Sequence, residues 1–373
     1  MSIQQTRLAA TARHLEAEQL EALIAFNGGQ NSFLEGHAVF VLSGVKPIGE
    51  SAVLVDRAGA STLIVTPAWD AKRAAAVSQT DKTVGSDDLP QALAAAVKAH
   101  GINPRKAVSV ALSTLSRALV AGIETAMGGS VPANDKYARE LARIRTPEEL
   151  EAARRATAIA ERGYARFLEF ARPGVREFEL AAELYGFMKG LGAEDNFLLL
   201  SASQHNLAVT AAGARVLDVG DIILSEITPC YQGQFAQICR TTVIGEPPAL
   251  LRDKYAVLQE AMRRGQAAAV PGASVRTVTE AIDDCIRAAG YGEYCRPPYM
   301  RVRGHGLGIT SDAPGDITVD NETRLEDGMV FVMHPNQYLP ETGYLMCGEP
   351  VVITPTGAKA LTAAIATLDS ISV

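Results

Sequence analysis

A strong helix start at Thr146 divides this chain into two parts. Thr146 is a good N-cap, Pro147 suits the first helical position, and Glu149 completes a capping box. The helix that follows carries apolar residues at helical spacing and stops at Pro173-Gly174. A chain of 373 residues is also long enough for more than one core. We therefore expect two domains, at residues 1–137 and 138–373.

The first domain alternates helical and strand patterns. The helical patterns cover Thr6–Glu18, Ala71–Ala76 and Leu89–His100, and the strand patterns cover Leu23–Phe26, Ser51–Val55, Thr62–Val65 and Val108–Leu112. This alternation predicts an α/β layer domain.

The second domain is dense in strand signals after its first helices. A further helix is expected near Phe178–Leu191, and the strand signals are IILSEI, QFAQICRTTVI, GMVFVMHP and GYLMCGEPVVI. Two helices, near Pro248–Ala269 and Val275–Ala289, separate these strands. Strands with grouped helices predict an α+β domain built around an antiparallel sheet.

Composition excludes several classes of partner. The net charge of -7, with scattered Lys and Arg, gives no basic surface for nucleic acid. No segment reaches the roughly 18 apolar residues of a membrane span, and the N-terminus lacks a signal-peptide pattern, so we expect a cytoplasmic protein. The five cysteines have no CxxC spacing, which favours buried free thiols over disulfides or a zinc ribbon.

Two of the six histidines have unusual neighbours. His305 lies between glycines in RGHGLG, where the backbone can approach a ligand closely, although a turn with a chance histidine has the same pattern. His334 ends the apolar run MVFVM and is followed by Pro335. Each ring is therefore a candidate for a polar pocket.

Two carboxylates also interrupt apolar strands. Glu226 follows Ile222-Ile223-Leu224, and Glu349 stands between Leu345-Met346-Cys347 and Val351-Val352-Ile353. A carboxylate in a buried strand is costly unless a charged or hydrogen-bonding group faces it. Together with the two histidines, these residues predict a polar hydrolytic or binding pocket, but they leave the reaction open.

The order of several segments carries a family resemblance. RLAATARHLEAEQLEALIAF, NSFLEG, ELARIRTPEELEAARRATAIAERG, GHGLG and GMVF follow one another over nearly the whole chain. In this order the sequence resembles the pita-bread enzymes, which include creatinase, prolidase, Xaa-Pro aminopeptidase and methionine aminopeptidase. The resemblance implies a creatinase-type N-terminal domain and a pita-bread catalytic domain.

The metal positions depart from the family pattern. Metal-dependent members carry two aspartates eleven residues apart, a histidine, a glutamate before proline and a last glutamate. The resemblance places these positions on Glu226, Gln237, His305, His334 and Glu349, with Asp312 in the place of a further histidine. Two carboxylates instead of four leave too little negative charge for two divalent cations. We therefore expect no metal cofactor, although His305, His334 and Glu349 leave open a single ion such as zinc.

The function expected from this resemblance is creatinase-like. We expect hydrolysis of a C–N bond in a small polar amidine, guanidino compound, cyclic amidine or amide, with His305 or His334 as general base. Glu226 and Glu349 would hold the substrate or attack it, while Gln237 and Asp312 would orient it. The alternatives are a single-metal Xaa-Pro aminopeptidase or amidase, and an inactive pita-bread binding module.

The resemblance also implies a homodimer. In this arrangement the segment from His37 to Lys46 of one chain reaches the pocket of the other. We expect His37 and His205 to contact the substrate.

Overall fold

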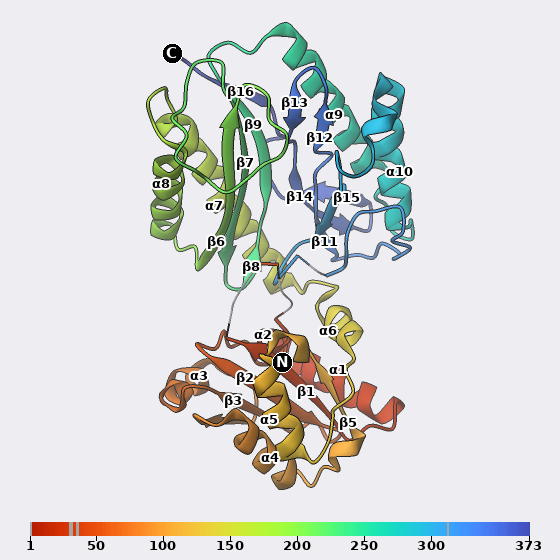
Figure 1. The fold of residues 1–373 in the computed structure, drawn as a ribbon. Helices are drawn as coiled ribbons and strands as arrows, with labels where there is room; N and C mark the ends of the chain where they lie inside the picture. Colours follow the sequence, from red (N-terminus) through yellow and green to blue (C-terminus); the bar gives the residue numbers. More distant parts are fainter. Residues whose placement is uncertain (1, 30–32, 35–36, 312) are drawn as a thin grey trace. The chain divides into compact units, whose positions relative to one another are not determined.

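The computed structural model describes residues 2–29, 33–34, 37–311 and 313–373. Two compact units are formed, Met1–Ala142 and Arg143–Val373. The elements of both units are labelled in Figure 1. The domain boundary expected after residue 137 falls within a helix, α6 (Asp135–Ala142), and stays a prediction.

The first unit is one sheet with helices on both faces. The strand order is β4-β3-β2-β1-β5, with β1 antiparallel to β2 and parallel to β5. Its elements are α1 (Ile3–Ala17), β1 (Ala22–Gly28), α2 (Ala38–Ser43), β2 (Glu50–Asp56), β3 (Ser61–Val65), η1 (Ala68–Asp70), α3 (Ala71–Val77), β4 (Lys82–Gly85), α4 (Leu89–Ala99), η2 (Pro104–Lys106), β5 (Ala107–Val110), η3 (Leu112–Thr114), α5 (Arg117–Met127) and α6.

Alternation along the strands divides the core of this unit into two. In β1, Ile24 and Phe26 pack with Leu93 of α4 and Ile123 of α5. The residues between them face the opposite side, where Leu23 and its neighbours pack with α1, α2 and α3. Successive side chains of a strand point to opposite faces, so each face buries its own helices. The expected α/β layer is confirmed.

The second unit contains two main sheets and two pairs of helices. One sheet has the order β16-β9-β7-β6 with β8 paired to β7, the other has the order β10-β11-β14-β15, and β12 and β13 form a hairpin. Its elements are α7 (Pro147–Phe170), α8 (Glu177–Gly190), β6 (Asp195–Ser203), β7 (Ile222–Tyr231), β8 (Gln234–Phe235), β9 (Ile238–Ile244), α9 (Ala249–Ala268), α10 (Val275–Ile286), η4 (Arg287–Tyr291), η5 (Gly292–Tyr294), β10 (Gly304–Gly306), β11 (Val330–Met333), β12 (Gln337–Leu339), β13 (Gly343–Leu345), β14 (Glu349–Thr354), β15 (Gly357–Ala360) and β16 (Leu368–Ile371).

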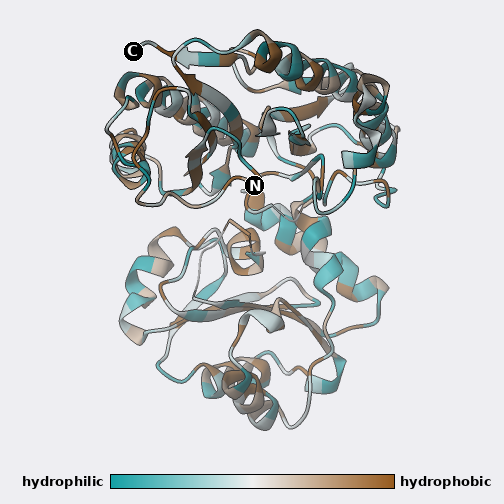
Figure 2. Cartoon of the chain, turned by 45° about the horizontal axis from the view of Figure 1, so that its top comes forward, coloured by the Kyte–Doolittle hydropathy of each residue, from teal (hydrophilic) through white to brown (hydrophobic). Residues whose placement is uncertain are grey.

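Each pair of helices covers its own part of these sheets. Ile223 and Ile227 of β7 pack with α7 and α8, whereas Ile222 and Leu224 of the same strand pack with α9 and α10. The helices show hydrophobic and hydrophilic residues side by side in Figure 2, as expected for helices with one packed face. The expected α+β architecture is confirmed. No helix among the described residues is long and apolar enough to cross a membrane.

The expected start of the long helix is also seen. Thr146 accepts a hydrogen bond from the Glu149 backbone N–H, and Glu149 Oε2 accepts one from the Thr146 N–H. This capping box begins α7 at Pro147.

Candidate active site

Glu226 and Gln237 face each other across two paired strands. Glu226 lies in β7, and Gln237 directly precedes β9. The Gln237 Nε2 group donates a hydrogen bond to Glu226 Oε1. Burial raises the pKa of Glu226 to about 7, although the hydrogen bond from Gln237 opposes this shift. The Glu226 carboxyl group therefore changes its charge near neutral pH.

The other end of the Gln237 amide is an available acceptor. The side chain is buried, and its Oε1 atom has no hydrogen-bond partner within the described residues. A buried polar atom in this state costs about 1–3 kcal/mol, which makes it unusual in an ordinary core. A donor on a bound ligand would satisfy it.

His305 and His334 stand next to each other on neighbouring strands. His305 is the central residue of β10, and His334 directly follows β11. Their ring centroids are 5.4 Å apart, and the rings meet edge to face at 67°. His305 Nδ1 donates to the Gly306 carbonyl oxygen at 2.8 Å, so the lone pair of the neutral ring lies on Nε2.

Burial keeps both imidazoles neutral. It lowers the pKa of His334 to about 3, with a smaller effect from His305, and it also lowers the pKa of His305. His334 Nδ1 is buried and lacks a hydrogen-bond partner among the described residues. The pair therefore offers ring nitrogens rather than positive charge at neutral pH.

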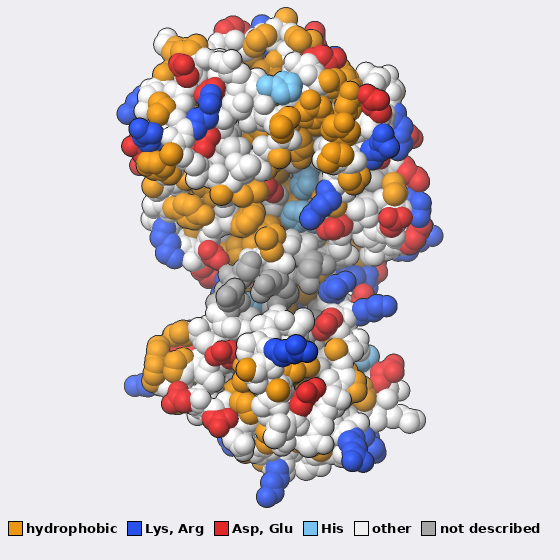
Figure 3. Space-filling view, in the orientation of Figure 1, with side chains coloured by type: hydrophobic (Ala, Val, Ile, Leu, Met, Phe, Trp, Pro, Cys, Tyr) orange, Lys and Arg blue, Asp and Glu red, His pale blue; other side chains and the backbone are white. Residues whose placement is uncertain are grey.

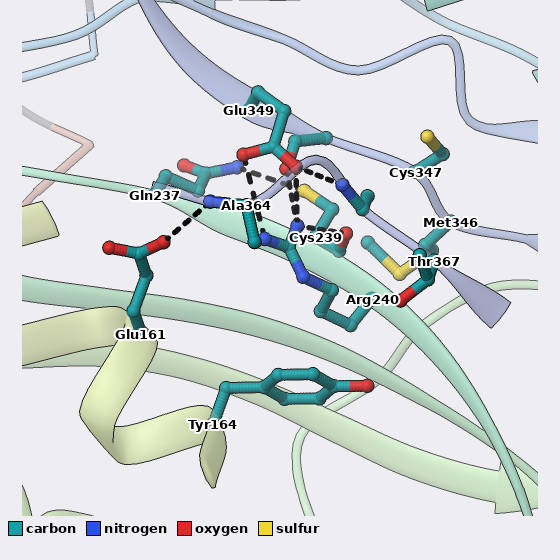
Figure 4. A network of polar contacts seen from close by, with 12 residues as sticks. Glu161, Tyr164, Gln237, Cys239, Arg240, Met346, Cys347, Glu349, Ala364 and Thr367 are labelled. Atoms are coloured by element: carbon teal, nitrogen blue, oxygen red, sulfur yellow. Dashed lines mark hydrogen bonds and ion pairs between the residues drawn. The ribbon is translucent and has the colours of Figure 1, made fainter. Parts of the chain in front are cut away.

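Glu349 is held by an internal cation. Its Oε1 atom lies 3.1 Å from Arg240 Nη1, and both side chains are buried. The Ala366 backbone N–H also donates to Oε1 at 2.7 Å. Figure 4 shows Arg240 reaching the Glu349 carboxyl group, with Gln237 and Cys239 on the adjacent part of the chain. The Arg240 guanidinium thus balances the charge of Glu349 within the protein.

A short bridge between the two sheets brings these groups to one junction. Cys239 and Gly348 exchange backbone hydrogen bonds of 3.1 and 3.0 Å. A Cβ atom on Gly348 would lie 2.7 Å from Cys239 Cβ and 2.9 Å from His334 Cβ, so glycine permits this close approach. Gln237 Nε2 lies 3.7 Å from Cys239 Sγ. The Glu226–Gln237 pair and the two histidines therefore border the same junction.

The remaining predicted site residues that the structure describes do not border this junction. His205 is exposed, and its ring meets Tyr338 at 6.0 Å. His37 belongs to the first unit, where its Nδ1 accepts the Phe40 backbone N–H at the start of α2. Asp312 lies outside the described residues, so its expected role stays a prediction.

Sequence reasoning missed two buried arginines that organise the site. Arg240 lies in the strand pattern QFAQICRTTVI, but the sequence predicted no role for it. Arg303 is fully buried, donating to Asp283 Oδ1 at 2.7 Å and to the Asn336 carbonyl oxygen at 3.0 Å. The Arg303 carbonyl oxygen accepts the His334 backbone N–H at 2.9 Å. An arginine within an apolar strand signals a buried acidic partner, but not which one.

Comparison with known proteins defines the class. The profile of metallopeptidase family M24 matches residues 151–355, which include Glu226, Gln237, His305, His334 and Glu349. This chain belongs to metallopeptidase family M24. The expected relationship to creatinase and the Xaa-Pro peptidases is confirmed.

Three similar proteins illustrate the relationship. An Xaa-Pro dipeptidase of Pyrococcus furiosus is 32% identical over 231 residues, covering 61% of this chain and 65% of that protein, less than two thirds of its length. The solved prolidase of Pyrococcus furiosus is 25% identical with a TM-score of 0.81, covering 95% of this chain and 99% of that one. An X-Pro aminopeptidase of Thermotoga maritima matches in fold, with 23% identity, a TM-score of 0.85 and coverage of 98% and 99%.

These matches correct two expectations. The similar proteins are named as peptidases, so the creatinase-like hydrolase of non-peptide substrates is wrong as the main interpretation. The expectation of no metal cofactor is contradicted as well, because the matching family is one of metallopeptidases. Both expectations started from the changed ligand set, which does not determine the substrate.

The side chains at the five family positions carry too few carboxylates for a pair of divalent ions. Within the described residues, no three His, Cys, Asp or Glu side chains converge on a common point suited to an ion. Gln237 carries no charge, and Arg240 already balances Glu349. A metal pair needs bridging carboxylates, which these residues do not supply. The single-ion set of His305, His334 and Glu349 stays a prediction.

Proposed function

We propose that this chain is an Xaa-Pro peptidase, which hydrolyses the peptide bond before proline in short peptides. The support comes from the family match and from relatives named Xaa-Pro dipeptidase. The observation that carries the proposal is the junction between the two sheets, where Glu226, Gln237 and the two histidines lie within the matched region. The relatives are named as hydrolases of Xaa-Pro dipeptides, and we propose the same substrate class for this chain.

Glu226 is our candidate for the general base. A carboxyl group with a pKa of about 7 can take a proton from water and return it at neutral pH. The His334 ring, with its pKa lowered to about 3, is a much weaker base in this range. We therefore assign base catalysis to Glu226 rather than to an imidazole.

The proposed reaction conserves atoms and protons. The water oxygen bonds to the peptide carbonyl carbon while Glu226 takes a proton from that water. The C–N bond then breaks, and Glu226 returns the proton to the proline nitrogen. Gln237 holds the Glu226 carboxyl group through its Nε2 donor and presents Oε1 to a donor on the substrate.

Tyr344 is our candidate for a donor in this site. Burial raises the pKa of its hydroxyl group, and the nearby Glu226 charge adds to the shift. The hydroxyl group therefore stays protonated at neutral pH. We assign it a hydrogen bond to the substrate carbonyl oxygen, where negative charge develops in the transition state.

Dimer formation and location remain part of this proposal. We expect a homodimer in the cytoplasm, with the segment from His37 to Lys46 near the partner's site, as the family resemblance implies. Sedimentation analysis of the full chain checks the oligomeric state. A monomer at all concentrations tested would contradict the proposed homodimer.

The test uses full-length protein purified without a metal-affinity tag. Hydrolysis of Ala-Pro and of Ala-Ala is followed with no added metal, with zinc and with manganese, and bound metal is measured by elemental analysis. We expect Ala-Pro to be cleaved and Glu226→Gln to lower kcat by about 100-fold or more. Glu280→Gln, on the exposed face of α10, is the matched control and should keep full activity.

Three results would contradict the proposal. Equal rates on Ala-Pro and Ala-Ala would remove the proline specificity. Full activity in Glu226→Gln would remove the base. Tight binding of Ala-Pro without turnover under any metal condition would indicate a binding module instead of an enzyme.

A further inference from the structure

Three tyrosines form a cluster beside the candidate active site. The ring centroids of Tyr294 and Tyr299 are 4.9 Å apart, and those of Tyr299 and Tyr338 are 5.4 Å apart. Tyr294 and Tyr338 close the triangle at 5.8 Å, and His205 meets Tyr338 edge to face at 6.0 Å. We call Tyr294, Tyr299 and Tyr338 the tyrosine cluster.

The tyrosine cluster reaches the surface. Tyr299 is 38% exposed, and Tyr294 and Tyr338 are only partly buried. Leu207, two residues from His205, is 74% exposed. Figure 3 shows hydrophobic side chains gathered on this face of the second unit, with histidine side chains among them. Exposed groups of aromatic and apolar side chains are typical of binding surfaces.

The hairpin β12–β13 connects this cluster to the site. Tyr338 is directly opposite Tyr344 in the hairpin register, so both side chains lie on one face of the hairpin. Asn206, whose backbone bridges to Gly343 of this hairpin, donates from Nδ2 to the carbonyl oxygen of Ile222, the first residue of the strand that carries Glu226. The hairpin therefore links the tyrosine cluster to the strand that carries Glu226.

Hydrogen bonds fix the cluster to the same framework as the histidines. Gln337 Nε2 donates to the Tyr294 carbonyl oxygen at 2.9 Å, and Gln337 Oε1 accepts from Arg303 at 3.0 Å. Arg303 is two residues before His305 and binds the His334 backbone. On the other side, the Asn206 carbonyl oxygen accepts the Tyr344 N–H at 2.7 Å. The rings are therefore held in place relative to the site.

We propose that the tyrosine cluster, with His205, is the subsite for an aromatic side chain on the residue before proline. This inference rests on the proposed function and names its preferred substrate class. The three rings meet at different angles, with Tyr294 and Tyr299 edge to face at 76° and Tyr299 and Tyr338 stacked at 26°. An aromatic side chain can meet such a surface in offset-stacked or edge-to-face geometry. The enzyme should therefore prefer Phe-Pro to Ala-Pro.

The experiment compares kcat/KM for the two dipeptides. We expect the wild-type protein to prefer Phe-Pro by about 10-fold, and Tyr299→Ala and Tyr338→Leu to reduce that preference to about twofold or less. The rate on Ala-Pro should fall by less than the rate on Phe-Pro, because a methyl group makes fewer contacts with the rings than an aromatic side chain does. Tyr185→Ala, at a tyrosine of α8 that is 45% exposed, is the control and should keep the wild-type preference.

A second readout keeps the subsite testable apart from turnover. Calorimetric titration with Phe-Pro and Ala-Pro should show tighter binding of Phe-Pro by wild-type protein and loss of that difference in Tyr299→Ala. An unchanged preference in both tyrosine variants would overturn the subsite even if Xaa-Pro hydrolysis is observed. Absent hydrolysis with a Tyr299-dependent binding preference would overturn the proposed function but support the subsite. Equal binding of both dipeptides would overturn the subsite.

Discussion

Arg240 joins the two sheets of the second unit through the buried carboxylate of Glu349. Its Nη1 atom is 3.1 Å from Glu349 Oε1, and the same atom donates to the Gly348 and Cys239 carbonyl oxygens at 2.8 and 3.0 Å. One guanidinium therefore contacts a side chain of β14 and both residues of the bridge beside the site.

Replacing Arg240 with methionine should destabilise the second unit strongly. The buried Glu349 carboxylate would lose its charge partner, which typically costs about 3–5 kcal/mol. Urea unfolding followed by circular dichroism, with hydrogen exchange to locate the loss, measures the change. Arg252→Met removes an exposed pair with Glu246 and should cost no more than about 1 kcal/mol. Equal stability of the two variants would contradict the interpretation.

A methyl group at Gly348 should disturb the junction at the site. The added atom would lie 2.7 Å from Cys239 Cβ, so the strands must separate, at a cost of about 1–3 kcal/mol. Dipeptide hydrolysis should fall as well. Gly186→Ala is the control, because an added Cβ in that position of α8 meets nothing and should stabilise by about 0.5–1 kcal/mol. Normal activity in Gly348→Ala would show that the close contact is not required.

The pH dependence of turnover should report Glu226. A general base must be deprotonated, so kcat/KM, which reports groups of the free enzyme, should rise with pH through the Glu226 pKa of about 7. Stopped assays across buffers of constant ionic strength measure this profile. In Glu226→Gln the residual rate should lose the inflection, whereas Glu280→Gln should keep it. An inflection that survives in Glu226→Gln must belong to another group.

His37 should make the first unit sensitive to acid. Burial lowers its pKa to about 4, so the unfolded chain binds the proton more readily than the folded one between that value and the ordinary value of 6.5. The stabilising contribution of the neutral ring is present above about pH 6.5 and is lost as the pH falls. The free energy of unfolding should therefore drop by about 2 kcal/mol between about pH 7 and pH 5.

Hydrogen exchange in α2 at the two pH values checks this prediction. In His37→Asn, the added acid sensitivity should disappear, because asparagine can still cap the helix but does not titrate. His205→Asn removes an exposed histidine and should leave the sensitivity of α2 unchanged. The same acid sensitivity in His37→Asn would show that another group is responsible.

Local patterns predicted most of the fold. The capping box at Thr146 predicted the start of α7 because its hydrogen bonds lie within three residues. The alternation of helical and strand patterns along the first unit predicted its α/β layer. Helix α6 was missed, because its eight residues make only about two turns, too few for a repeating apolar pattern to stand out. The strand orders could not be predicted from local patterns, because they depend on pairing between segments that are distant in the sequence.

The site was predicted in part. The residue pattern indicated that Glu226, Glu349, His305 and His334 belong to a polar pocket, and the family resemblance added Gln237. The structure brings Glu226, Gln237 and the two histidines to one junction. The pairing of Glu349 with Arg240 was not predicted, because it joins strands separated by two helices in the sequence. The proposed substrate rests on the names of relatives rather than on the residues of the site.

The contact between Cys239 and Gly348 has a consequence for how this protein matures. Its two sides are separated by roughly a hundred residues, and closing so long a loop delays the contacts that depend on it. The newly made chain should therefore form its helices and the β12–β13 hairpin before the Cys239–Gly348 bridge completes the site. Activity would then return more slowly than secondary structure after dilution from denaturant, with the exchange of the Cys239 amide marking the last step.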